Sequence, residues 1–138
     1  MDSLIPFVGH HPLLVGLLVA LLVAFFLNER ARGGRSLTPQ EVVTLINRDS
    51  ALVIDLRDTK EFQTGHIVDA LNIPFSALAE RLPELTAHKL RPIVLICRMG
   101  QHAGAAGTTL QKAGFAQVAR LSGGMTEWQN SNLPTTKN

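Results

Sequence analysis

The chain has 138 residues, a formal net charge of +2 and a single cysteine, Cys97. This length suits one compact domain. One cysteine cannot form an internal disulfide, so a disulfide-stapled secreted scaffold is excluded. No block of basic residues accompanies the small positive charge, and we therefore expect no nucleic-acid partner.

The N-terminal segment is strongly apolar. Residues 3–28 contain no Asp, Glu, Lys or Arg, and residues 13–27 form fifteen consecutive apolar positions. A helix of that length is about 22 Å long, short of the roughly 30 Å hydrocarbon core. A membrane span would therefore extend back toward Leu4 through Pro12, where the helix would start or kink. A cleaved signal peptide would need a basic leading region, and a buried core helix would need a polar face. We predict one retained transmembrane helix.

The flanks of this segment predict its orientation. Arg30, Arg32 and Arg35 follow the apolar run, and no basic residue other than histidine precedes it. The positive-inside rule then places the N-terminus outside and the C-terminal domain in the cytoplasm. Residues 1–35 are accordingly interpreted as an anchor with a short basic hinge, whose glycines supply flexibility, and residues 36–138 as the folded domain.

Strand-like and helix-like segments alternate through this domain. Short apolar runs at 51–56, 70–74, 91–97 and 117–121 predict buried strands. Between and around them, helical patterns cover 36–49, 58–66, 75–82, 102–114 and 123–134. This order predicts an α/β fold, with a parallel sheet of about five strands flanked by helices on both faces. The ligand site of such a fold lies beyond the carboxyl ends of the strands.

Cys97 falls at one of these strand ends. A free cysteine there can be simple core packing. Three neighbouring features favour a reactive thiol instead: Arg98 follows at once, Gly100 can adopt a positive φ, and a helix starts near Ala103. Free amides at that helix start would favour the thiolate and stabilise a negatively charged sulfur adduct.

Two classes of cysteine enzyme use such a loop. Cysteine phosphatases need Cys, five residues and then Arg, but the corresponding position here is Ala103. Sulfur transfer is the other class, and three ordered motifs support it. The segments VIDLRDTKEFQTGHIVDALNIP, CRMGQH and LSGGMTEWQNSNLP resemble the signatures of single-domain rhodaneses, and the resemblance covers residues 38–134.

The resemblance implies a rhodanese-like fold and a sulfurtransferase activity that needs no cofactor or metal. Cys97 would take a sulfane sulfur from thiosulfate or a similar donor as a persulfide and pass it to cyanide, a thiol or a protein acceptor. The substrate would be bound by the rest of the loop, which consists of Arg98, Met99, Gly100, Gln101 and His102. Asp55 and Arg57, after the first predicted strand, would support the site as an ion pair.

Two departures from the family pattern stand out. Val68-Asp69 occupy a position where Pro-Gly is common, and His102 stands where Arg, Thr or Ser is frequent. His102 is either a loop residue bonded to the backbone or a donor to an anionic substrate. Since the chain has no second cysteine, the persulfide would need an outside acceptor.

With its apolar segment, the chain is similar to small membrane-tethered rhodaneses of bacteria, which implies a single-pass protein of the inner membrane. The alternative interpretation is a non-enzymatic docking module, tethered to that membrane and bound to another membrane protein.

Overall fold

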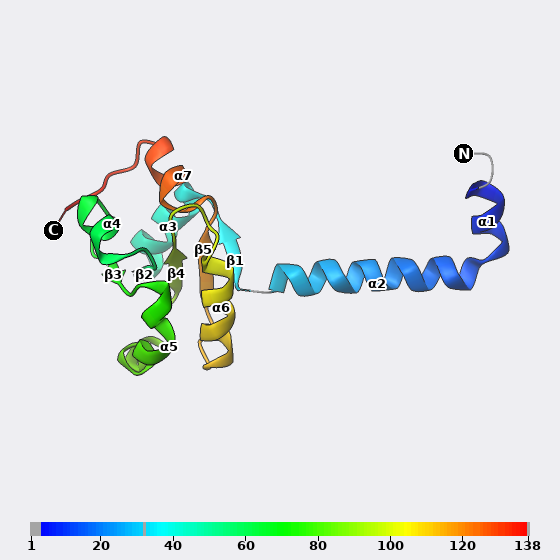
Figure 1. The fold of residues 1–138 in the computed structure, drawn as a ribbon, viewed down its shortest axis with the longest axis horizontal. Coiled ribbons are helices and arrows are strands. Elements are labelled where there is room, and N and C mark those ends of the chain that lie inside the picture. The colour runs from blue at the N-terminus through cyan, green and yellow to red at the C-terminus, as the bar shows by residue number, and fades with distance from the viewer. Residues whose placement is uncertain (1–3, 32, 138) are drawn as a thin grey trace. The chain divides into compact units, whose positions relative to one another are not determined.

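The computed structural model describes residues 4–31 and 33–137. The chain divides into two compact units, Met1–Ala31 and Arg32–Asn138. The first unit holds the helices α1, Leu4–His10, and α2, Pro12–Ala31. The second holds every strand that the structure describes (Figure 1).

The apolar segment forms two helices, where the sequence predicts one. The break falls directly before Pro12, which has no amide hydrogen and whose ring crowds the preceding helical turn. The two helices are bent by 98° relative to each other. Among the described residues, no single helix is long and apolar enough to cross a membrane. The pair Leu4–His10 and Pro12–Asn28 meets that requirement only when taken together.

The second unit is a parallel five-stranded sheet in the order β1-β5-β4-β2-β3, as the alternation of elements predicts. The strands are β1, Arg35–Leu37; β2, Leu52–Asp55; β3, Leu71–Asn72; β4, Ile93–Ile96; and β5, Val118–Leu121. The α-helices are α3, Pro39–Asp49; α4, Thr59–Thr64; α5, Leu78–Arg81; α6, Ala103–Lys112; and α7, Gly124–Asn130. Two 3₁₀ segments, Phe75–Ala77 and Leu82–His88, flank α5.

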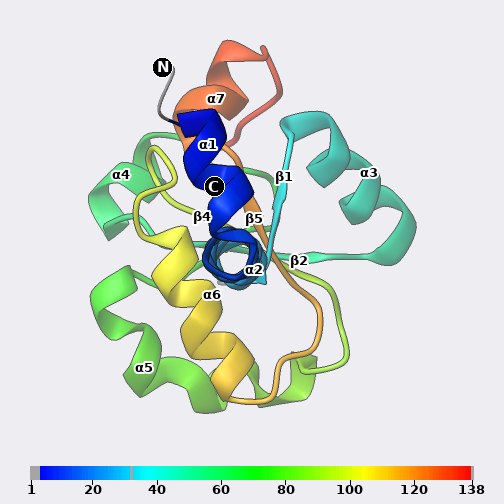
Figure 2. The ribbon, with the colours of Figure 1, turned by 90° about the vertical axis from the view of Figure 1, so that its right-hand side faces the viewer.

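Helices cover both faces of the sheet (Figure 2). Alternate residues of each strand point to opposite faces, so β4 divides its side chains between two cores. Ile93 and Leu95 pack with α5 and α6, whereas Val94 and Ile96 pack with α3 and α7. This arrangement leaves the carboxyl ends of β2 and β4 open for a site.

Part of the predicted hinge belongs to the folded second unit. Gly33 and Gly34 are buried, and Arg35 begins β1. A Cβ atom on Gly107 of α6 would overlap the carbonyl oxygen of Gly33, so glycine at Gly107 lets the entering chain lie directly on the helix. The segment therefore packs against the domain at these two glycines, where the sequence predicts flexibility.

Candidate active site

Cys97 continues the side-chain alternation of β4 and joins the core cluster of the α6 face. It is a free cysteine and is 3% exposed. The residue nevertheless lines a pocket of about 510 Å³ at the carboxyl end of the sheet. The thiol is therefore recessed at the end of its strand, and access to it is through this pocket.

The start of α7 fixes the first two residues of the loop. The amide of Met125 donates to the carbonyl oxygen of Cys97 at 2.9 Å, and the amide of Thr126 donates to that of Arg98 at 3.0 Å. Gly124 has a φ of 60°, and a Cβ atom there would overlap the carbonyl oxygen of Cys97. Glycine at this position thus allows the close approach that holds the loop.

The remaining loop amides are available for an anion. Gly100 has the expected positive φ, 90°, and α6 begins at Ala103, as the sequence predicts. Among the described residues, no backbone carbonyl accepts a hydrogen bond from the amides of residues 98–102. Free amides that precede a helix N-terminus form a suitable environment for a negatively charged sulfur.

A buried ion pair lies behind the pocket. Arg57 donates from Nε to Oδ1 of Asp55 at 3.0 Å and from Nη2 to Oδ2 at 2.8 Å. Arg57 Nη2 also donates to the carbonyl oxygen of Gly65 at 2.7 Å. Arg57 lines the pocket, while Asp55 is 1% exposed and holds the guanidinium in place. The pairing of these two residues agrees with the sequence prediction.

Arg98 has a carboxylate partner that the sequence analysis did not anticipate. Its Nε donates to Oε2 of Glu61 at 2.9 Å, and its Nη2 lies 2.7 Å from Oε1. The hydrogen bond from Arg98 lowers the pKa of Glu61, against the opposing effect of burial. The same bond raises the pKa of Arg98. The mouth of the pocket therefore holds a charged, bidentate pair.

Two apolar side chains, Met99 and Phe75, also line the pocket. The ring of His102 stacks on that of Phe75, with centroids 4.7 Å apart and planes inclined by 17°. Met99 is 53% exposed and Phe75 is 36% exposed. Phe75 was not among the predicted site residues, although it follows β3 and so lies at the same edge of the sheet as Cys97.

The structure brings most of the predicted site residues to this pocket. Gly100 shapes the loop and Asp55 lies behind, and neither lines the cavity. The lining consists of Leu56, Arg57, Asp58, Glu61, Phe75, Ser76, Cys97, Arg98, Met99, Gln101 and His102. Within residues 4–31 and 33–137, no group of three or more His, Cys, Asp or Glu side chains is placed to hold a metal ion.

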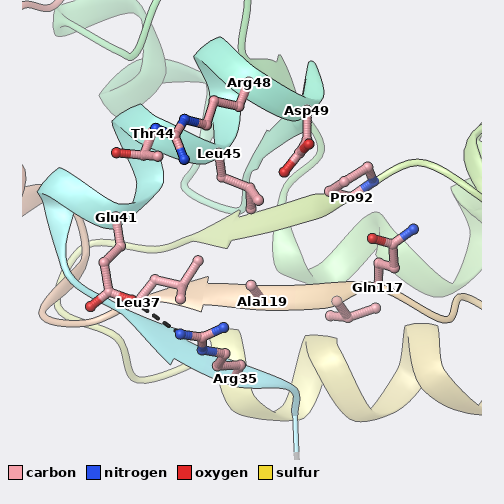
Figure 3. Close-up of a pocket in the computed structure, with 11 residues that line it drawn as sticks. Arg35, Leu37, Glu41, Thr44, Leu45, Arg48, Asp49, Pro92, Gln117 and Ala119 are labelled. Carbon is pink, nitrogen blue, oxygen red and sulfur yellow. Dashed lines mark ion pairs between the residues drawn. The ribbon is translucent and has the colours of Figure 1, made fainter.

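A second pocket, of about 410 Å³, lies between α3 and the strands β1 and β5 (Figure 3). Pro92 and Gln117 line it, and they precede β4 and β5, so this pocket is at the opposite end of the sheet from Cys97. Its described lining contains the ion pair between Arg35 and Glu41, and no cysteine or histidine. Of these two pockets, the first combines a cysteine with free backbone amides.

Comparisons with known proteins identify the family of the chain. The uncharacterized protein YibN of Escherichia coli (strain K12) is 36% identical over 142 residues, covering 99% of each chain. The rhodanese-related protein of Thermoplasma volcanium has a TM-score of 0.69 and 26% identity, covering 75% of this chain and 99% of its own. An E. coli rhodanese structure with anions has a TM-score of 0.55 and 26% identity, covering 64% of this chain and 99% of its own. The model of the rhodanese-like domain matches residues 38–131, and the chain therefore belongs to the rhodanese-like family.

Proposed function

We propose that the protein is a sulfurtransferase that carries a sulfane sulfur on Cys97. The observation that supports this most strongly is the position of the cysteine, which directly follows β4, lines a pocket and begins a loop with free amides. A sulfane sulfur donor is attacked by the Cys97 thiolate, and the loop amides stabilise the persulfide that forms. No cofactor takes part in this exchange.

The acceptor in this proposal is an outside thiol, protein or cyanide. Cys97 is the only cysteine of the chain, so the persulfide cannot be resolved as an internal disulfide. A protein acceptor at the membrane would suit a tethered carrier.

Mass spectrometry of the intact chain tests the proposal. After incubation with a sulfane sulfur donor and removal of the excess, we expect the chain to gain the mass of one sulfur atom. Peptide mapping should locate that atom on Cys97. A chain that gains no sulfur from any sulfane donor would favour the docking module over the enzyme.

We further propose that the N-terminal unit anchors the chain in the bacterial inner membrane, with its N-terminus outside and the C-terminal domain in the cytoplasm. The described large apolar side chains of this unit are exposed from Leu4 at 63% to Leu27 at 62%, apart from Val15, which is half-buried. The bent helix pair has the length and composition of a broken span. The match to YibN also extends through this region, because it covers 99% of both chains. The arginines after the apolar run support the orientation.

Alkaline extraction of membranes tests the anchor. We expect the full chain to remain with the membrane pellet and a variant with Leu17→Arg and Leu21→Arg to be released, because charge at the centre of a span is costly. Leu90→Arg is the matched control, since Leu90 is 88% exposed and lies in the second unit. Release of the natural chain by the same wash would contradict the proposal.

A further inference from the structure

Both arginines of the active-site pocket are already bound to carboxylates. Arg57 is held by Asp55 and by the carbonyl oxygen of Gly65, and Arg98 is held at two points by Glu61. Each guanidinium therefore has its charge compensated before a substrate arrives.

The charges of the side chains that line the pocket sum to zero. Glu61 and Asp58 line the cavity together with the two arginines, so the charged side chains of the lining cancel. Asp58 is the N-cap residue of α4, but its side chain makes no capping hydrogen bond. The carboxylate of Asp58 therefore adds a negative charge to the pocket lining. A substrate with two negative charges therefore gains no net attraction from these side chains, and the loop amides alone favour an anion.

The rim beside these pairs suits an organic group. Met99 and Phe75 expose apolar surface in the pocket lining, and the ring of His102 stacks on that of Phe75. Apolar side chains of this kind contribute binding energy when they are covered. Inorganic thiosulfate has no group that could cover them.

We infer that the sulfur donor is an organic sulfane carrying at most one negative charge, such as the persulfide of a thiol, in preference to the thiosulfate dianion. This inference rests on the sulfurtransferase function proposed above. The Cys97 thiolate attacks the outer sulfur of R–S–SH, a new S–S bond forms to Sγ, and the S–S bond of the donor breaks. The products are Cys97–S–SH and R–S⁻, so the electron pair leaves on the donor thiolate and no external oxidant is needed.

Two donors of different charge test the inference. Thiosulfate is a dianion, whereas benzenethiosulfonate is a monoanion with an apolar ring, and both deliver one sulfane sulfur. We expect the natural chain to be loaded by benzenethiosulfonate with a kcat/KM at least about tenfold higher than by thiosulfate. The rate of mass gain on Cys97 measures both reactions.

Glu61→Gln should shift this preference. The carboxylate of Glu61 repels both charges of thiosulfate but only one charge of benzenethiosulfonate. Its removal should therefore raise kcat/KM about tenfold for thiosulfate and about threefold for benzenethiosulfonate. Asp58→Asn should shift the preference in the same direction, and Asn remains a good N-cap residue. The gains should shrink as the salt concentration rises.

Glu84→Gln is the matched control. Glu84 forms a similar bidentate pair with Arg81 outside the pocket, and the substitution changes the net charge of the chain by the same amount. We expect it to leave both rates unchanged. Equal effects of Glu61→Gln and Glu84→Gln would overturn the inference, because they would reflect overall charge alone.

The outcomes separate this inference from the proposed function. If neither donor loads Cys97, the sulfurtransferase proposal itself fails. If both donors load it but thiosulfate is used equally well or better, the inference on the donor class is overturned and the proposed function stands. A thiosulfate gain in Glu61→Gln no larger than the benzenethiosulfonate gain also overturns the inference.

Discussion

Substitution of Cys97 by Ser is expected to lower the rate of sulfur transfer by at least about a thousandfold, to that of the uncatalysed reaction. A serine hydroxyl is a far weaker nucleophile and cannot form a persulfide. The chain has no other cysteine that could take over the role. The formation of thiocyanate from a sulfane donor and cyanide measures the rate.

The loss of activity counts only if the Cys97→Ser variant keeps its fold. Cys97 is buried in the α6-side core, so the far-ultraviolet circular dichroism and the melting temperature should be recorded for both chains. Cys97→Ala provides a second inactive form without the polar hydroxyl. A folded Ser or Ala variant that retained a tenth or more of the natural rate would contradict the assignment of Cys97.

Substitution of Arg57 by Met is expected to lower the free energy of unfolding by about 3–5 kcal/mol. The change leaves the carboxylate of Asp55, at 1% exposure, without its charged partner and with only the backbone amide of residue 57 as a donor from that position, and it removes the donor to the carbonyl oxygen of Gly65. Urea unfolding, followed by the fluorescence of the single, buried Trp128, measures the effect.

The double variant with Arg57→Met and Asp55→Leu distinguishes an unpaired charge from lost packing. We expect it to recover part of the stability lost in Arg57→Met, because neither ionic group remains in the core. Glu84→Gln, which removes the exposed carboxylate of the ion pair with Arg81 and keeps the hydrogen bond from Arg81 to the carbonyl oxygen of Asn72, is the surface control and should have little effect. A double variant less stable than Arg57→Met would show that the unpaired charge of Asp55 is not the main cause of the lost stability.

Much of the second unit could be predicted from the sequence because its signals are local. The apolar run that ends at Cys97 is long enough to indicate a buried strand, and the start of α6 follows from the glycine-containing turn before it. The pairing of Asp55 with Arg57 could also be predicted, since the two residues are separated by a single position at the end of β2. Local spacing thus predicted that Cys97 follows a buried strand and begins a loop that leads into a helix.

The features missed in the sequence depend on contacts between distant segments. β1 has three residues, too few to show an alternating pattern, and it exists through its pairing with β5. Glu61 and Arg98 are 37 positions apart, and the stack of His102 on Phe75 joins two different loops. These contacts can be inferred only when the order of the strands in the sheet is known, because that order brings the strand ends together. They determine the charge and shape of the mouth of the active-site pocket.

The break in the apolar segment has a different origin. The composition of residues 13–27 is uniform and predicts a helix without specifying its ends. Pro12 was expected to start or kink the helix, and α2 does begin there. The two separate helices therefore reflect the backbone chemistry of one residue rather than the hydropathy of the segment.

A single-turnover discharge tests most directly the claim that Cys97 carries sulfur as an intermediate. The chain is loaded with a sulfane donor, freed of all donor by gel filtration, and then mixed with cyanide. The account predicts one thiocyanate per loaded chain and a return of the protein to its original mass. Thiocyanate that forms only while donor is present, from a chain that never holds sulfur on Cys97, would contradict it.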